Sequence, residues 1–426
     1  MLKKTLKHNH ESSSWKLHIL PVLCIAFIAS LLLFSKVAVN SAIKGIDLWL
    51  NVVFPCIFPF LVASEILSST NFIKAVGVIL EPVMQPIFNA PGCASFPLAL
   101  GITSGYPVGA KVITSMKENK LISCKVAERL LAFCNNSSPL FIMGAVSVGM
   151  LKMPQTGALL LICHIAAGIS VGIIYKFHNY DKKKKSTSTF SNYFRTKKIP
   201  DNTSANISAN INPLTDLGNL LTNAVKNAVT SLLTIGGFII IFSVIINLLI
   251  ETGIIEVLIN LFYPVLKYTR LPKEFFVCLS SGFIEITTGL KMLSSLENIS
   301  FNVRLTAVSA ILGWGGISVH MQIYSIINNS KLSIKPYLIG KLMQSVISAF
   351  YTLLALKVMG KISQPTASIF GYFSINTREL TTWYQYFLNS CKHLTILILF
   401  FLFLIIIAII MSLIKHFLEK LYKYKL

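Results

Sequence analysis

The chain has 426 residues, of which 54% are hydrophobic and only 13% are charged, and its mean hydropathy is +0.68. Too few polar residues are available to cover a soluble domain, so the composition predicts an all-α protein that crosses a membrane several times. The net charge of +22 could suggest nucleic-acid binding. Most basic residues, however, lie between the apolar segments, where they set membrane orientation or contact anionic lipid, and we expect no nucleic-acid partner.

The first apolar run, residues 17–36, has a basic flank like that of a signal sequence. No cleavage motif follows it, which favours an uncleaved membrane helix, so residues 1–41 form an N-terminal tail and this first helix. Further apolar runs of spanning length bring the predicted number of crossings to eight: residues 42–68, 126–150, 155–177, 222–250, 302–328, 335–358 and 386–414.

Two other apolar stretches, residues 93–116 and 274–297, carry polar and helix-breaking residues at their centres. The first contains Thr103-Ser-Gly-Tyr-Pro107 and the second Glu285-Ile-Thr-Thr-Gly289. A broken helix facing lipid would leave backbone groups without hydrogen-bond partners, which favours re-entrant hairpins buried in protein. An amphipathic segment suited to the membrane interface precedes each hairpin, at residues 70–89 and 253–269.

The two hairpins belong to two copies of one module. Landmark residues of the first half recur about 180 residues later, an internal repeat typical of transporters: Pro82, Gly101, Gly109, Lys111 and Lys152 match Pro264, Gly282, Gly289, Lys291 and Lys331. Each copy has an odd number of crossings, so the copies are predicted to be inverted. We assign residues 42–177 to repeat 1, 178–219 to a polar linker, 220–358 to repeat 2, and 359–426 to a loop, a last membrane helix and a basic tail.

The distribution of basic residues predicts the orientation. If the N-terminus is cytoplasmic and the first hairpin does not cross, most Lys and Arg fall in cytoplasmic connections, including the linker and residues 329–341. We therefore expect both termini in the cytoplasm. The linker has too little apolar surface to fold by itself.

Candidate substrate-binding residues lie at the hairpin centres and in the crossing that follows each hairpin. They are Thr103, Ser104, Gly105, Asn135, Asn136, Ser137 and Ser138 in the first half, and Glu285, Thr287, Thr288, Trp314 and Ser318 in the second. The hydroxyls and free N–H groups at the first hairpin centre favour an anionic ligand. Glu285 is a carboxylate within the membrane, which can carry a cation or accept a substrate group. Trp314 can stack on a planar ring. The alternative is that small residues permit close packing, polar residues hold helices together, and Glu285 pairs with Lys291.

Lys111 and Lys291 occupy equivalent positions just beyond the hairpin centres. Two symmetry-related cations could hold a dianion, or both could extend to opposite membrane surfaces.

We expect no metal site and no enzymatic activity. The eight cysteines form neither a CxxC pair nor a metal-ligand spacing, and Cys134, His164 and His320 share no motif of nucleophile and base. A nucleotide-binding loop of the Gly-Lys-Ser/Thr kind is absent from the sequence, so we expect no direct use of ATP.

Three motifs carry a family resemblance: Phe54–Phe60, Gly101–Lys111 and Cys134–Pro139. Through them the chain resembles the YlbJ-type sporulation integral membrane proteins, which contain nucleoside-recognition Gate domains, over residues 17–415. The resemblance implies an outer forespore membrane protein that brings dipicolinic acid from the mother cell toward the forespore. It also implies the architecture of concentrative nucleoside transporters, with Thr103, Ser104, Asn136, Ser137, Glu285 and Ser318 at the substrate site.

The segment Gly313-Trp-Gly-Gly316 replaces the polar pattern that this resemblance implies for ribose recognition, and it suits a flat aromatic diacid better. We therefore expect a transporter of a small aromatic dicarboxylate, dipicolinic acid, that works by alternating access. A coupling Na⁺ or H⁺ and a homo-oligomer remain open. The alternatives are a non-transporting membrane scaffold for spore cortex assembly and a nucleoside-like transporter.

Overall fold

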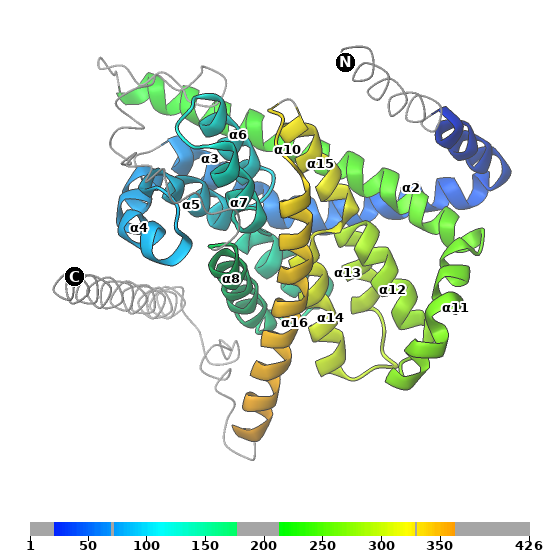
Figure 1. Ribbon diagram of the computed structural model, residues 1–426. Helices are drawn as coiled ribbons and strands as arrows, with labels where there is room; N and C mark the ends of the chain where they lie inside the picture. The colour runs from blue at the N-terminus through cyan, green and yellow to red at the C-terminus, as the bar shows by residue number, and fades with distance from the viewer. Residues whose placement is uncertain (1–20, 70–71, 177–212, 329, 363–426) are drawn as a thin grey trace, which may run out of the picture.

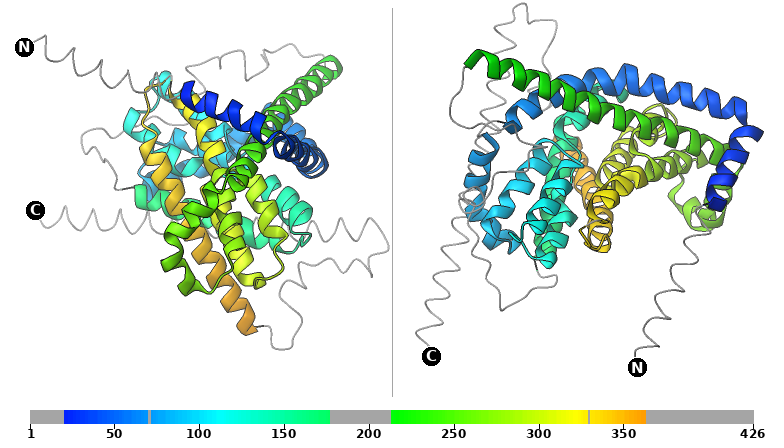
Figure 2. Two further views of the ribbon diagram at one scale, coloured as in Figure 1. Left: turned by 90° about the vertical axis from the view of Figure 1, so that its right-hand side faces the viewer. Right: turned by 90° about the horizontal axis from the view of Figure 1, so that it is seen from above.

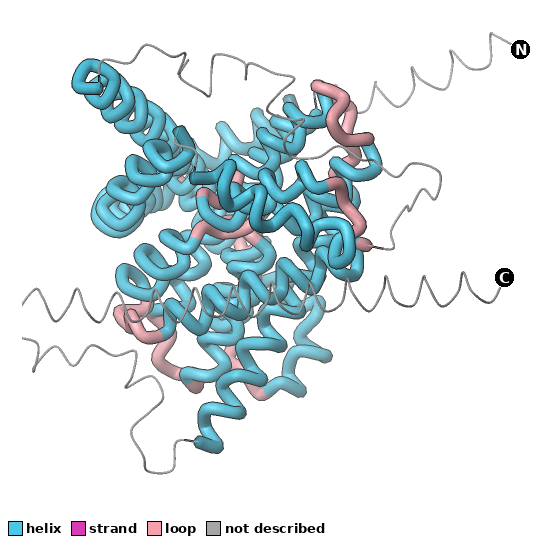
Figure 3. The backbone as a smooth tube through the Cα atoms, turned by 90° about the vertical axis from the view of Figure 1, so that its left-hand side faces the viewer, coloured by secondary structure: helices cyan, strands magenta, loops and turns pink. Residues whose placement is uncertain are grey.

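The computed structural model describes residues 21–69, 72–176, 213–328 and 330–362. Residues 178–212 of the predicted linker and the predicted crossing at 386–414 lie outside the described residues. Residues 213–219, predicted as the end of the linker, are helical instead. Within the described ranges every regular element is a helix, as Figures 1 and 3 show, which confirms the all-α prediction.

Five helices of the described residues are long and apolar enough to cross a membrane: Ser35–Ala63, Thr156–Tyr175, Gly218–Glu251, Phe301–Asn328 and Lys335–Val358. Three predicted crossings differ from the structure. The first apolar run contains a shorter helix, Pro21–Leu33, and the next helix begins earlier than predicted, at Ser35. The predicted crossing at residues 126–150 is divided, because one helix ends at Cys134 and the next begins at Phe141.

The first half of the chain contains these elements: α2 (Ser35–Leu48), η1 (Trp49–Val53), α3 (Phe54–Ser69), α4 (Phe72–Phe88), η2 (Gly92–Ala94), α5 (Ser95–Thr103), α6 (Val108–Glu118), α7 (Cys124–Cys134), η3 (Phe141–Met150) and α8 (Thr156–Tyr175). The second half repeats the order: α10 (Pro213–Glu251), α11 (Ile254–Leu266), η4 (Lys267–Thr269), α12 (Lys273–Ile284), α13 (Ile286–Ser294), α14 (Phe301–Trp314), α15 (Gly316–Asn328) and α16 (Lys335–Ile362). Each half therefore has a long helix, an amphipathic helix, a helical hairpin, a broken helix and a final helix.

The repeat extends to backbone details. Lys152 and Lys331, matched in the sequence, both adopt the left-handed conformation, each with φ of 54°. Asn89 and Arg270, which follow the amphipathic helix of their half, do the same with φ of 51° and 59°. Non-glycine residues rarely adopt this conformation, so its recurrence at matched turns indicates that the halves fold alike.

Equivalent helices of the two halves pack antiparallel, which shows that the repeat is inverted. Along α2 and η1, Ser41 and then Trp49 contact α10: Ser243 Oγ donates to the Ser41 carbonyl (3.0 Å), and Trp49 Nε1 donates to the Leu232 carbonyl (3.1 Å). The two long helices lie side by side in the right-hand view of Figure 2. Similarly, the Tyr175 hydroxyl at the end of α8 donates to the Pro336 carbonyl at the start of α16 (2.8 Å).

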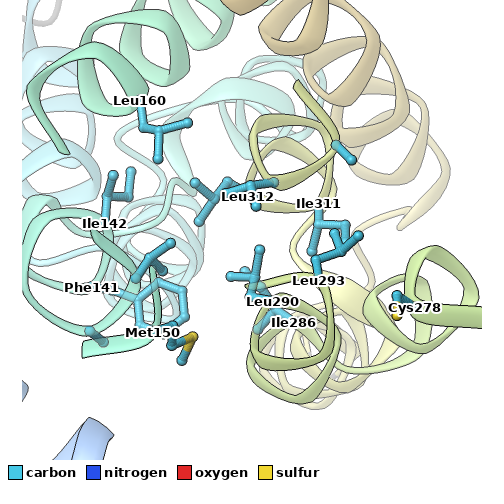
Figure 4. Close-up of a cluster of buried hydrophobic side chains, with 14 of the residues drawn as sticks. Phe141, Ile142, Met150, Leu160, Cys278, Ile286, Leu290, Leu293, Ile311 and Leu312 are labelled. Carbon is cyan, nitrogen blue, oxygen red and sulfur yellow. The ribbon is translucent and has the colours of Figure 1, made fainter. Parts of the chain in front are cut away.

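A hydrophobic cluster joins the two repeats. Phe141 and Ile142 of the broken helix in repeat 1 belong to the same buried cluster as Ile286 and Leu290 of the hairpin in repeat 2, as Figure 4 shows. Leu312, at the end of α14, belongs to it as well. This packing holds the broken helix of one repeat against the hairpin of the other.

The first hairpin packs on the end of α7 with no room for a side chain at Gly101. A Cβ atom added there would lie 1.6 Å from the Cys134 carbonyl oxygen. Gly101→Ala should therefore displace the hairpin and destabilise the fold by about 1–3 kcal/mol, the usual cost of overpacking. The measurement is thermal unfolding of the purified protein in detergent.

Gly237→Ala in α10 is the matched control, because a Cβ atom at Gly237 meets nothing within 4 Å. It should raise stability slightly, since alanine favours helix. Equal melting temperatures for the two alanine variants would contradict the close approach of α5 and α7.

Candidate functional site

Both broken helices are interrupted at matched positions. In repeat 1, residues 135–138 separate α7 from η3, and Asn135 is extended, with φ of −105° and ψ of 96°. In repeat 2, α14 ends at Trp314, and Gly315 and Gly316 have φ of 90° and 84°. Asn135 and Asn136 of one break thus correspond to Gly315 and Gly316 of the other.

Each hairpin centre contacts the helix break of its own repeat. In repeat 1, a Cβ atom on Gly105 would lie 2.8 Å from the Ser138 nitrogen, and the Tyr106 N–H donates to the Asn136 carbonyl (2.9 Å). In repeat 2, a Cβ atom on Gly316 would lie 3.4 Å from the Glu285 Cα atom. The first hairpin is therefore brought together with Asn136 and Ser138, and Glu285 with the second helix break.

The two repeats meet at Ser137. Its hydroxyl oxygen lies 3.3 Å from the Tyr106 hydroxyl and 3.4 Å from the Leu312 carbonyl oxygen, at the end of α14. The Tyr106 hydroxyl also lies near Glu285 of the second hairpin. The helix break of repeat 1 thus lies beside the helix break of repeat 2, and both hairpin centres are close to the two breaks.

Behind Ser137 lies a buried network of polar side chains from α8 and α16. The Ser137 N–H donates to His164 Nε2 (3.1 Å), and Gln344 Nε2 donates to Asn136 Oδ1 (2.8 Å) and to the His164 carbonyl (3.3 Å). Lys341 Nζ donates to Gln344 Oε1 (2.7 Å). We call Tyr106, Asn136, Ser137, His164, Lys341 and Gln344 the central polar cluster.

Four members of this cluster were missing from the predicted site: Tyr106, His164, Lys341 and Gln344. The prediction that Lys341 belongs to the connection 329–341 was wrong, because Lys341 lies within α16 and is only 3% exposed. A lysine inside the predicted crossing 335–358 was the signal that could have identified it. For Gln344 the signal was its position, which corresponds to His164 of repeat 1.

In the second hairpin, Glu285 caps α13 instead of leaving its N-terminus open. Its two carboxylate oxygens accept hydrogen bonds from the backbone N–H groups of Thr287 (2.9 Å) and Thr288 (2.6 Å). The carboxylate is 2% exposed, and within the described residues it forms no ion pair with Lys291. The protein's own carboxylate thus occupies the anion position at this helix N-terminus.

Trp314 attaches the second hairpin to the second break. Its ring stacks on Phe283 with centroids 4.3 Å apart, and its Nε1 donates to the Phe283 carbonyl (2.9 Å). His320 makes an edge contact with Trp314 at 4.3 Å, and His320 Nδ1 lies 3.0 Å from the Tyr337 hydroxyl. Stacking of a substrate ring on Trp314 stays a prediction, and Phe283 already covers one face of the indole.

Several other candidates bond within their own segment. Thr103 Oγ1 donates to the Ala99 carbonyl (2.9 Å), Ser138 Oγ accepts from the Phe141 N–H (3.2 Å), and Asn135 Nδ2 donates to the Leu131 carbonyl (3.2 Å). Ser104 is half-buried, and Ser318 is buried in the first turn of α15.

The paired lysines differ in their surroundings. Lys111 is exposed and interacts electrostatically with Glu65 of α3, whereas Lys291 is half-buried. Among the described residues, neither lysine forms a hydrogen bond with the central polar cluster. Binding of one dianion by both lysines stays a prediction. In the same part of the chain, no group of His, Cys, Asp and Glu side chains could hold a metal ion.

The capping role of Glu285 can be tested by substitution. Glu285→Ala should lower the free energy of unfolding by about 0.5–2 kcal/mol, because both N–H groups of α13 lose their acceptor, while Glu285→Asp should retain most of the stability, since Asp is a good N-cap. Thermal unfolding in detergent measures both. Glu297→Ala, at an exposed position, is the control. Equal losses for the Ala and Asp variants would contradict the capping role.

Comparison with known proteins identifies related chains. The family model described as Gate, nucleoside recognition, matches residues 50–153 and 232–375, one stretch in each repeat. The sporulation integral membrane protein YlbJ of Bacillus subtilis (strain 168) is 35% identical over 355 residues, which cover 83% of this chain and 86% of that protein.

Solved structures of CNTnw are similar at lower identity. A variant of CNTnw in the intermediate 3 state is 13% identical, with 80% of this chain and 86% of that chain covered and a TM-score of 0.45. CNTnw in an inward-facing substrate-bound state is 12% identical, with 78% and 83% covered and a TM-score of 0.43. The identity to YlbJ over most of both chains, and the Gate match in both repeats, show that this chain belongs to the YlbJ family of sporulation integral membrane proteins.

Proposed function

We propose that this protein transports a small aromatic dicarboxylate, dipicolinic acid, across the outer forespore membrane by alternating access. The observation that carries the proposal is the meeting of two hairpin centres and two helix breaks in a buried polar cluster between inverted repeats. Broken helices at a repeat interface are the usual site of substrate binding in secondary transporters. The proposal includes cytoplasmic termini, and it leaves Na⁺ or H⁺ as the coupling ion.

The chemistry of the cluster suits an acid with a flat ring. Lys341 supplies a positive charge, and the amides of Asn136 and Gln344 supply polar groups beside it. The hydroxyl groups of Tyr106 and Tyr337 lie near each other. Both carboxylate oxygens of Glu285 already accept backbone N–H groups. Lys341 is therefore available to bind a ligand.

Two rival functions make different predictions. A non-transporting scaffold for the spore cortex needs no buried polar cluster in its interior, and such a cluster costs stability unless every member is satisfied. A nucleoside-like transporter agrees with the description of the Gate family. It requires recognition of a neutral ribose, whereas Gly315 and Gly316 supply no side chain at the second break.

The proposal predicts uptake of labelled dipicolinate into proteoliposomes that contain the purified protein. Asn136→Ala should lower the initial uptake rate about tenfold or more, because it leaves the Gln344 amide without its acceptor in a buried site. Ser104→Ala should lower uptake through the first hairpin centre. Asn223→Ala, at an exposed position of α10, should leave uptake unchanged.

Normal dipicolinate uptake in both site variants would remove the proposed site. Uptake of labelled uridine without uptake of dipicolinate would replace the substrate with a nucleoside. Uptake of neither compound, by protein with an undisturbed melting transition, would favour the scaffold.

A further inference from the structure

Lys341 is a buried amine without a carboxylate partner among the described residues. It lies in α16, a helix long and apolar enough to cross a membrane, and it is 3% exposed. An ammonium group has three hydrogen-bond donors. Among the described residues its only hydrogen bond goes to Gln344 Oε1, at 2.7 Å, and no carboxylate pairs with it.

The buried carboxylate of the second hairpin, Glu285, already has partners. Both oxygens of Glu285 accept backbone N–H groups of α13. A charge removed from water without a partner costs several kcal/mol, and buried charges in membrane helices are therefore usually paired or in contact with a substrate path. The surroundings of Lys341 thus lack an anion.

The side chains around Lys341 offer further donors rather than acceptors. His164 Nε2 accepts the Ser137 N–H, so the neutral ring carries its proton on Nδ1, and that atom is buried without a partner within the described residues. In the same part of the chain, His320 Nε2 is also buried without a partner. Both rings lie near Lys341.

The orientation of Gln344 is fixed by its neighbours. Its Nε2 donates to Asn136 Oδ1 at 2.8 Å, which directs Oε1 toward Lys341. The ammonium group is therefore held beside the first helix break by a network that crosses the repeat interface. A positioned amine next to the unpartnered N–H of His164 is an arrangement suited to a carboxylate.

We infer that Lys341 is the anion-binding centre of the site and takes one carboxylate of the transported substrate, with His164 and His320 as additional donors. This inference rests on the proposed function for the identity of the substrate. It assigns recognition of negative charge to a residue of α16 and not to the hairpin lysines. It also gives the central polar cluster a chemical class of ligand, an oxyanion on a small planar molecule.

The test is isothermal titration of full-length protein in lipid nanodiscs with three probes: dipicolinate, its neutral analogue pyridine-2,6-dicarboxamide, and inorganic phosphate. Wild-type protein should prefer dipicolinate to the dicarboxamide. Lys341→Met should weaken dipicolinate binding about 10- to 100-fold, the usual worth of a hydrogen bond to a charged group, and leave the dicarboxamide unaffected. Lys341→Arg should restore part of the affinity.

Lys357→Met, on an exposed face of the same helix, is the matched control and should bind dipicolinate like wild type. A second variant covers the case in which Lys341→Met does not fold. Gln344→Glu places a carboxylate next to Lys341 Nζ, so it should form an internal ion pair and abolish dipicolinate binding.

Equal dipicolinate affinity in wild type and Lys341→Met, or in wild type and a folded Gln344→Glu, would overturn the inference while leaving transport intact. Failure of wild type to bind any of the probes would also overturn it. Binding of phosphate that depends on Lys341, without binding of dipicolinate, would support the anion centre and refute the proposed substrate.

Discussion

Backbone groups freed at a helix break must find partners inside the protein, because lipid offers none, and this constraint organises the structure. Each break is covered by the hairpin of its own repeat: Tyr106 donates to the Asn136 carbonyl at one, and Gly316 packs against Glu285 at the other. The two halves then pack against each other through the hydrophobic cluster that contains Leu312. The polar site thus forms because the two inverted broken helices need hydrogen-bond partners for their free backbone groups inside the protein.

The two halves share a backbone plan but differ in side chains, and the differences create the chemistry. Where repeat 1 has Gly105 at its hairpin centre, repeat 2 has Glu285, which caps the following helix. Where repeat 1 has His164, repeat 2 has Gln344, and these two matched residues touch across the interface. A symmetric pair of folds therefore encloses an asymmetric site, with a cation on the side of α16 and a capped carboxylate in the second hairpin.

Much of the fold could be predicted from sequence, because landmark residues such as Pro82 and Gly101 recur at matched positions of the second half. The broken helices and hairpin centres could be predicted because helix-breaking and polar residues gather there, as at Gly105 and Pro107. The site could be predicted only in part, since which side chains meet depends on packing between segments far apart in the chain. Lys341 illustrates this: the charge bias of loops placed it in a connection, whereas α16 begins at Lys335 and carries it inside. Likewise, nothing in the sequence near Trp314 indicates that Phe283 covers its ring.

The central claim is that a substrate reaches the cluster at the first helix break from either side of the membrane. The most direct measurement is labelling of Ser137→Cys, in protein whose native cysteines are replaced, by a membrane-impermeant thiol reagent added to one side or the other of sealed, oriented vesicles. We predict slow reaction from both sides and protection by dipicolinate, because Ser137 lies where the repeats meet and alternating access exposes it in turn. Reaction from one side alone, or a rate that dipicolinate does not change, would contradict the claim.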